Sequence, residues 1–131
     1  MSSKNKAAGT AWETAIVNFL VKWWAKIERR QLAGMFDKGD IINGPSDWTV
    51  EAKTAKTINL PRFLREAKAE SINARTRWYV AVVKNRRGPL SSGSVDEAFA
   101  VMPLGLWAEL VNEHEQLREA NPGWFYRGAD G

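Results

Sequence analysis

Three charged residues in one short stretch are spaced so that their side chains could act together. Asp40 is followed eleven residues later by Glu51, and Lys53 stands two positions further on. Alternation along residues 47–54 places Glu51 and Lys53 on the same face of a strand, with Cα atoms about 7 Å apart. Neighbouring carboxylates repel each other unless positive charge lies between them, and a divalent cation with oxygen ligands meets that need. Lys53 would add a fixed positive charge beside it.

A turn signal predicts the hairpin that brings these residues together. Residues 39–42 read as a short strand, and Asn43-Gly44-Pro45-Ser46 is dense in turn formers. The turn can place Asp40 beside Glu51. A glutamate-x-lysine triplet is common by chance, and a second copy at residues 66–68 lies in a helical stretch, where we interpret it as ordinary surface charge. The presence of Asp40 nearby favours the triplet at residues 51–53 as the functional one.

Residues 9–25 are predicted to form an amphipathic helix with Thr10 as a possible N-cap. Glu13 falls inside the apolar arc of this helix, where a carboxylate is costly to bury unless it is satisfied. It could act as a cap or form a salt bridge with an arginine, or it could reach over the sheet edge into a metal site, and we favour the metal site. The apolar stripe consists of Trp12, Ile16, Phe19, Leu20 and Trp23.

Basic residues are expected around this site. Residues 26–32 read as a strand in which Arg29 and Arg30 point to opposite faces, so that one of them can grip a phosphate bidentately. Residues 85–94 form a Gly/Ser/Pro loop that either closes over a bound backbone or is only a solvated turn. The other residues predicted to contact the same phosphate-bearing partner are Thr54 and Lys56 after the third strand, Arg62 on the second helix, and Arg86 and Arg87 in the loop.

The rest of the chain continues in alternating elements. The second helix is predicted at residues 59–76, with Pro61 in its first turn. Its inward residues are predicted to be Phe63, Leu64, Ala67 and Ile72. Strands follow at residues 78–84 and 97–102, and a helix at 104–117. The resulting fold class is α/β, a mixed β-sheet with helices on both faces.

The length of 131 residues favours one domain, with a flexible basic arm at residues 1–8 and a C-terminal tail at 118–131. The aromatic residues of the tail could pack on the domain or on a second subunit. The absence of cysteine excludes thiolate zinc sites, and the presence of a single histidine excludes most histidine-based catalysis. Without a signal peptide or a long apolar run, we expect a cytoplasmic protein, neither secreted nor in a membrane.

Charge is distributed unevenly along the chain. Residues 1–87 hold 17 Lys and Arg against 8 Asp and Glu, whereas residues 88–131 hold 2 against 7. Asp40, Glu51 and Lys53 therefore lie in the basic part of the chain. The positive charge of this part would draw a polyanion towards these three residues. Nucleic acid is the expected partner, although each basic residue alone could simply solvate a helix.

The order of these motifs resembles the PD-(D/E)XK nuclease superfamily, whose core is αβββαβ. Within it the chain is most similar to the small Holliday junction resolvases of archaea and of bacterial viruses, over about residues 9–110. One departure is that glycine, not proline, precedes the aspartate. The motifs are Gly9-Thr10-Ala11-Trp12-Glu13, Glu28-Arg29-Arg30, Gly39-Asp40-Ile41, Val50-Glu51-Ala52-Lys53-Thr54 and Lys84-Asn85-Arg86-Arg87-Gly88.

This resemblance implies a restriction-endonuclease-like fold and a metal-dependent nuclease. Asp40, Glu51 and the main-chain carbonyl of Ala52 would bind Mg²⁺ or Mn²⁺, and Glu13 would hold a second metal or its water. Lys53 would orient the attacking water or offset charge on the phosphate. The metal would lower the pKa of that water and stabilise both oxygens of an in-line displacement. The resemblance also implies a homodimer that nicks two strands of branched DNA, with no small-molecule cofactor.

Three other functions stay open. Another nuclease of the same fold, acting on linear duplex, flaps or single nicks, would have an identical site. A nucleic-acid-binding protein without catalysis, or a structural protein with ordinary ion pairs, would not need Asp40, Glu51 and Lys53 together. We rank the junction resolvase first and the other nucleases second.

Overall fold

The computed structural model describes residues 3–30, 39–86 and 95–125. The chain divides into two compact units, Met1–Val101 and Met102–Gly131, and each is described by itself. All the described site residues lie in the first unit. Arg87 and most of the loop at 85–94 lie outside the described residues.

Helix α1 spans Ser3–Leu20 and begins earlier than the sequence indicated. Part of the predicted arm is therefore helical, and Thr10 lies inside the helix instead of capping it. The physical reason is that lysine and alanine before Gly9 are good helix formers and no proline interrupts them. The helix also ends sooner than predicted, and Trp23, which was expected on the buried stripe, is 58% exposed.

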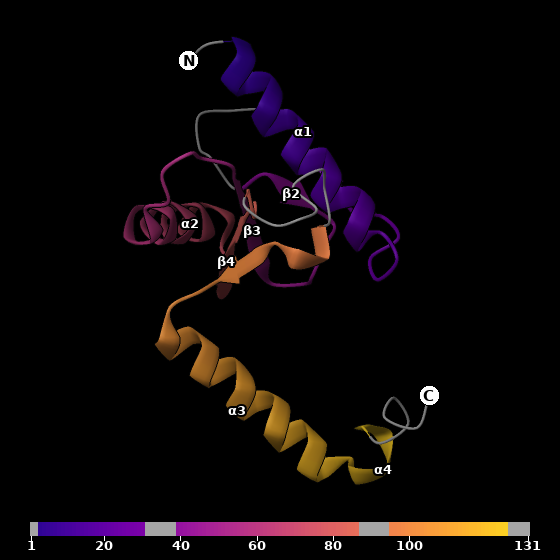
Figure 1. The fold of residues 1–131 in the computed structure, drawn as a ribbon. Coiled ribbons are helices and arrows are strands. Elements are labelled where there is room, and N and C mark those ends of the chain that lie inside the picture. Colours follow the sequence, from indigo (N-terminus) through magenta and orange to yellow (C-terminus); the bar gives the residue numbers. More distant parts are fainter. Residues whose placement is uncertain (1–2, 31–38, 87–94, 126–131) are drawn as a thin grey trace. The chain divides into compact units, whose positions relative to one another are not determined.

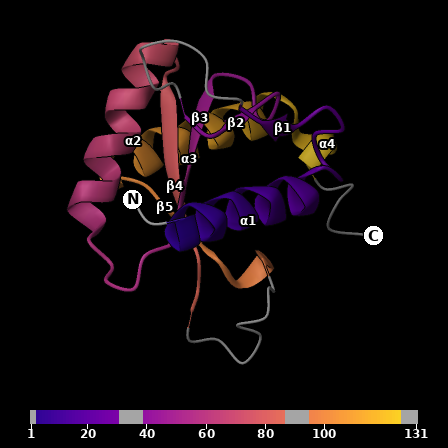
Figure 2. The same ribbon diagram turned by 90° about the horizontal axis from the view of Figure 1, so that it is seen from above.

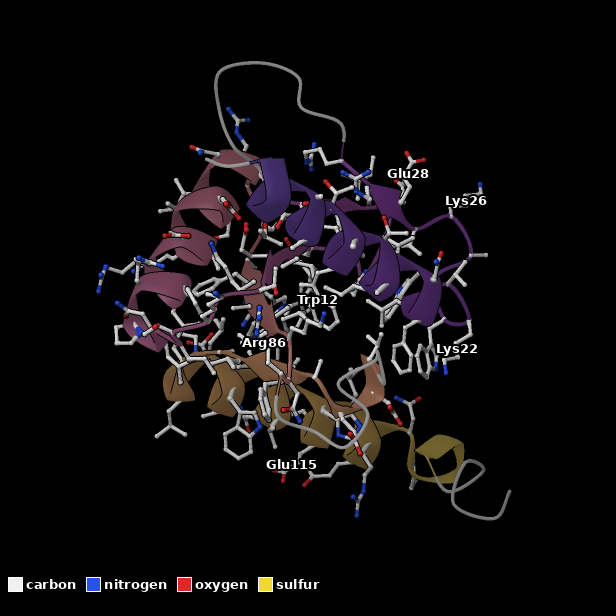
Figure 3. All side chains as sticks on the ribbon, turned by 45° about the horizontal axis from the view of Figure 1, so that its top comes forward. Trp12, Lys22, Lys26, Glu28, Arg86 and Glu115 are labelled. Carbon is white, nitrogen blue, oxygen red and sulfur yellow. The ribbon has the colours of Figure 1, made fainter. Side chains whose placement is uncertain are left out.

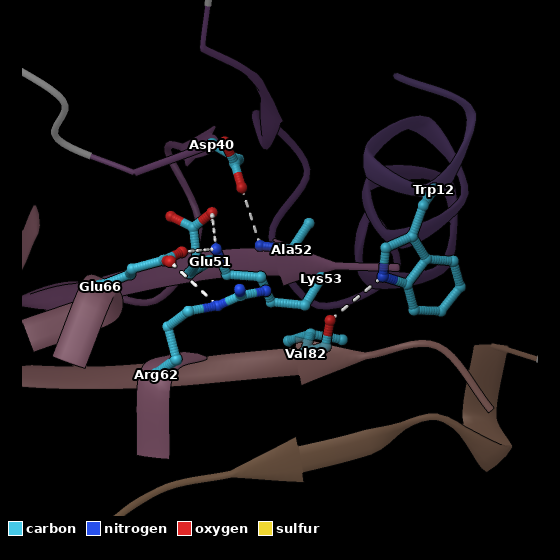
Figure 4. A network of polar contacts seen from close by, with 8 residues as sticks. All are labelled: Trp12, Asp40, Glu51, Ala52, Lys53, Arg62, Glu66 and Val82. Atoms are coloured by element: carbon cyan, nitrogen blue, oxygen red, sulfur yellow. Dashed lines mark hydrogen bonds and ion pairs between the residues drawn. The ribbon is translucent and has the colours of Figure 1, made fainter. Parts of the chain in front are cut away.

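The buried stripe of α1 is short and packs on the sheet. Trp12 and Ile16 are almost fully buried against Val50 and its neighbours. The indole N–H of Trp12 donates a hydrogen bond to the main-chain oxygen of Val82 at 3.1 Å, which fixes the helix over strand β4, Trp78–Val83 (Figure 4). Figure 3 shows Trp12 among the inner side chains, whereas Lys22 and other labelled charged residues of this region point outward.

The next three strands are shorter than predicted. Strand β1 is Glu28–Arg29, β2 is Ile41–Ile42 and β3 is Trp48–Lys53. Strands β1 and β2 pair antiparallel in a sheet of their own. The Asp40 N–H donates to the Val50 oxygen at 3.3 Å and connects this small sheet to β3.

Helix α2 spans Leu60–Ala74, close to its predicted bounds. The Asn59 side chain caps it by accepting a hydrogen bond from the Arg62 N–H, and a proline occupies the first turn, as the sequence indicated. Arg75 ends it in the left-handed conformation. Ile72 was predicted to face inward but is 66% exposed. The buried face instead runs through Phe63, Ala67, Glu70 and Ser71.

Strands β3, β4 and β5 form the second sheet. Strand β4 (Trp78–Val83) runs parallel to β3, as an intervening helix allows. Strand β5 (Phe99–Val101) is antiparallel to β4 and follows a short 3₁₀ turn, η1, at Val95–Glu97. The sheet is therefore mixed, in the order β3-β4-β5.

Helices α1 and α2 cover opposite faces of this sheet (Figure 1, Figure 2). Val50 and Val82 belong to the core under α1, whereas Ala81 and Val83 belong to the core under Phe63 of α2. The predicted α/β class, with a mixed sheet between helices, is confirmed. The difference is that the strands form two small sheets instead of one.

The second unit is helical where it is described. Helix α3 spans Leu104–Ala120 and extends beyond the predicted end. A short helix, α4, follows at Pro122–Phe125, so the predicted tail begins inside α3 and includes this turn. Among the described residues, no helix has the length and apolar character needed to cross a membrane.

Candidate nuclease site

The Asp40 carboxylate is fixed against strand β3. Its Oδ2 accepts a hydrogen bond from the main-chain N–H of Ala52 at 2.8 Å (Figure 4). Asp40 therefore lies beside the Glu51-Ala52-Lys53 triplet, as expected. This contact also uses the edge of β3 that faces away from β4. The predicted hairpin itself is not formed, because β2 pairs with β1 and β3 pairs with β4.

The carbonyl of Ala52 faces the same edge. The Lys84 N–H donates to the Lys53 oxygen at 3.0 Å, so the carbonyl of Lys53 points towards β4. Successive carbonyls along a strand point to opposite sides, and the N–H and C=O of one residue point to the same side. The carbonyl oxygen of Ala52 consequently points towards the side of Asp40. The resemblance places a metal ligand there.

Gly39 explains why proline does not precede the aspartate in this chain. Its φ is +100°, a value that the proline ring, fixed near −65°, does not reach. A Cβ added at Gly39 would lie 2.9 Å from Cγ2 of Thr49. Glycine is therefore required by both the backbone conformation and the space, and it lets the chain pass close to β3 just before Asp40.

Glu51 is more deeply buried than Asp40 or Glu13. The residue is 5% exposed, and its Oε1 lies 3.6 Å from Nζ of Lys53. Its Oε2 is buried and has no hydrogen-bond partner within the described part of the chain. A buried carboxylate oxygen without a partner is costly. A cation at this oxygen would remove the cost, so the residues present fit a divalent metal.

Lys53 lies between two carboxylates. Its Nζ contacts Glu51 and forms a close ion pair with Glu66 of α2 (Figure 4). Glu66 in turn lies 3.6 Å from Nε of Arg62, one helical turn earlier. Glu66 is a surface charge on a helix, as interpreted, with a side chain that is 43% exposed, but it also contacts Lys53 of the site. Its spacing of four from Arg62 is visible in the sequence, but its contact with Lys53 is not.

Glu13 lies on α1 beside Asp40 and Arg29. Its Oε2 is 3.4 Å from Nε of Arg29, so the arginine pair that the sequence left open is present. Burial raises the pKa of Glu13 first of all, the charge of Asp40 raises it further, and Arg29 opposes both. A hydrogen bond with the Asp40 carboxyl also raises this pKa. Glu13 is thus within reach of Asp40, and its role towards a metal stays a prediction.

Arg29, the last residue of β1, and Arg30, which follows it, have different partners. Arg29 is on the side of Glu13, and its side chain is 40% exposed. Arg30 donates from Nε to the Gly39 oxygen at 3.0 Å and is partly buried. Arg30 therefore braces the segment that leads to Asp40, and Arg29 is the better candidate for binding a phosphate.

The other predicted DNA-binding residues are distributed around the site. Thr54 is half-buried just after β3, and Lys56 is exposed two residues later. Arg62 joins the site through Glu66. Arg86 is exposed beyond the end of β4.

The structure thus brings four predicted site residues and one unpredicted residue together. They are Glu13, Asp40, Glu51 and Lys53, with Glu66 added from α2. Within residues 3–30, 39–86 and 95–125, no three His, Cys, Asp or Glu side chains are grouped as a ready metal-binding cluster. The predicted ligand set has three carboxylates, Glu13, Asp40 and Glu51, and the main-chain oxygen of Ala52, and these three carboxylates do not form such a cluster in the described part of the chain.

Comparison of the chain with protein-family models, with curated proteins and with solved structures finds no match.

Proposed function

We propose that this protein is a metal-dependent DNA endonuclease with a PD-(D/E)XK fold that resolves four-way junctions. The observation that supports it most is the buried Glu51 carboxylate, with one oxygen unpartnered among the described residues and the Asp40 and Lys53 side chains beside it. The element order from α1 to β4 and the parallel β3-α2-β4 unit agree with such a core.

Asp40, Glu51 and the Ala52 oxygen would hold Mg²⁺ or Mn²⁺, since these hard cations bind oxygen ligands. A bound cation would supply charge stabilisation at the phosphate and lower the pKa of the attacking water. The hydrogen bond from Ala52 N–H keeps Asp40 at this edge of the strand. Glu13 would hold a second metal or its water.

The remaining residues act on the water and on the phosphate. In hydrolysis a water oxygen bonds to phosphorus and the P–O3′ bond breaks. The water gives up a proton and the leaving O3′ takes one, which leaves a 5′-phosphate and a 3′-hydroxyl. Lys53, on the same strand face as Glu51, would orient the water or offset charge on the phosphate. Arg29 would grip a substrate phosphate.

Junction resolution by a homodimer is supported by the motif resemblance. Two sites related by a twofold axis would nick opposed strands of a four-way junction and leave ends that a ligase can join. The excess of basic residues in the part of the chain that holds the site favours a polyanionic substrate.

The substrate can be tested with DNAs of matched sequence. A labelled four-way junction, a linear duplex and a flap are incubated with the protein and Mg²⁺. Paired, symmetric nicks in the junction alone are expected. Equal cutting of the duplex or flap would instead indicate a general nuclease, and salt-dependent binding without any cutting would indicate a non-catalytic binding protein.

A further inference from the structure

Lys53 is held by a carboxylate that the resemblance does not assign. Its ammonium group touches Glu51 on its own strand and Glu66 on helix α2. The Lys53 side chain is only 17% exposed, although it carries a full charge. The two carboxylates therefore fix a flexible side chain at the position where the reaction would need it.

The contact with Glu51 would weaken during the reaction. Once the carboxylate of Glu51 serves a divalent cation, part of its negative charge is neutralised and the cation itself repels the ammonium of Lys53. Glu66, the partner of Lys53 on α2, would keep its negative charge because it does not bind the cation. Glu66 is then the group that keeps Lys53 beside the metal site.

Glu66 is well placed for this task because its helix is anchored on both sides of it. Phe63 and Ala67, its neighbours along α2, are buried against the sheet. Asn59 caps the start of the helix, and Arg62 lies 3.6 Å from the other carboxylate oxygen of Glu66. A charged group on a rigid helix holds its partner more accurately than one on a loop.

The Arg62–Glu66 contact is the exposed part of this network. The Glu66 side chain is 43% exposed and that of Arg62 is 55% exposed. Ion pairs at this exposure contribute little to folding. The network nevertheless connects an exposed arginine, suited to a DNA phosphate, with the lysine of the site.

We propose that Glu66 is a positioning residue for Lys53, and that Arg62 links this pair to the substrate backbone; the inference rests on the proposed nuclease function. Glu66 acts through Lys53 and does not touch the reacting atoms. Its loss should therefore lower the rate of the chemical step and leave metal binding unchanged. DNA binding should stay the same or tighten, since a negative charge is removed.

The test uses the full chain with Glu66→Ala and Glu66→Gln, and Glu97→Gln as a control at an exposed glutamate of the same unit. The single-turnover rate of junction cleavage should fall on the order of 10- to 100-fold with Glu66→Ala, without weaker binding of the junction. Glu66→Gln keeps an acceptor for Lys53 and should recover most of the rate. In a Lys53→Ala background, Glu66→Ala should have no further effect, as expected of residues that act as a unit.

A second measurement does not depend on activity. A lysine-acylating reagent, read out by mass spectrometry, should label Lys53 several-fold faster in Glu66→Ala than in the unaltered chain, with Lys56 as the internal reference. Cleavage by the unaltered chain together with unchanged cleavage by Glu66→Ala would overturn the inference and leave the nuclease in place. Unchanged labelling of Lys53 would overturn it too. If the unaltered chain cut no DNA, the proposed function itself would fall.

Discussion

The Asp40 carboxylate accepts a hydrogen bond from the main-chain N–H of Ala52 at 2.8 Å, across twelve positions of the sequence. This contact places an acid at the edge of β3 where the Ala52 carbonyl also opens. It joins the segment before β2 to strand β3, so that oxygen atoms from two segments lie at one edge. Substitutions at the site and around it should therefore have distinct effects on cleavage, on DNA binding and on folding.

Replacement of Asp40 should separate cleavage from binding. Asp40→Asn keeps an oxygen for the Ala52 N–H but loses the charge that a divalent cation needs. We expect junction cleavage to fall on the order of 10²- to 10³-fold, by analogy with the loss of one electrostatic stabiliser. DNA affinity, measured by fluorescence anisotropy in EDTA, should be unchanged or higher because repulsion of phosphate falls. Loss of binding together with cleavage would count against the site.

The raised pKa of Glu13 predicts how stability depends on pH. The folded state favours the protonated carboxyl, so this stabilising contribution is fully present below the ordinary pKa of 4.5 and is lost as pH rises through the raised folded pKa. Glu13→Gln mimics the protonated form. In EDTA, its unfolding free energy relative to the unaltered chain should increase from acid to neutral pH, measured by urea denaturation. An opposite trend would show that the Arg29 ion pair dominates.

Gly39 and Gly9 offer a matched pair of glycine substitutions. Gly39→Ala forces a side chain into φ +100° and a 2.9 Å approach to Thr49, so it should destabilise the fold by about 1–3 kcal/mol. Gly9→Ala lies in helix α1 with no atom within 4 Å of the new Cβ. It should stabilise the protein by about 0.5–1 kcal/mol. Urea denaturation measures both, and equal effects of the two would contradict the account of the Asp40 approach.

Salt dependence tests whether DNA is bound through the basic part of the chain. The logarithm of the affinity should fall steeply with the logarithm of salt concentration, by about 0.9 per phosphate contact. Lys56→Ala, at an exposed lysine after β3, should reduce this slope by about one contact. Arg118→Ala, in α3 of the second unit, is the control. A flat salt response of the unaltered chain would remove nucleic acid as the partner.

Local signals in the sequence were enough for the turn before β3 and for α2. Asn43-Gly44-Pro45-Ser46 predicted the turn between Asp40 and β3, and Asn59 with a following proline predicted where α2 begins. These signals depend on residues adjacent in the chain. They can therefore be recognised in the sequence without knowledge of the tertiary packing.

The features that were missed depend on packing between distant segments. The contact of Glu66 with Lys53 is set by the rotation of α2 against β3, which periodicity does not give. Ile72 was assigned to the wrong side for the same reason, since the buried face follows Glu70 and Ser71. The ends of the short strands β1 and β2 are set by the hydrogen bonds between them. The pattern of apolar residues along one segment does not reveal those ends.

Cleavage of the four-way junction by Glu51→Gln beside Glu97→Gln, with Mg²⁺ and with EDTA, tests the central claim most directly. The two variants make the same chemical change, one at the buried carboxylate of the site and one at an exposed glutamate. The account predicts Mg²⁺-dependent nicking by the unaltered chain and by Glu97→Gln, and none by folded Glu51→Gln. Cleavage by Glu51→Gln at the full rate, or cleavage that EDTA does not stop, would contradict it.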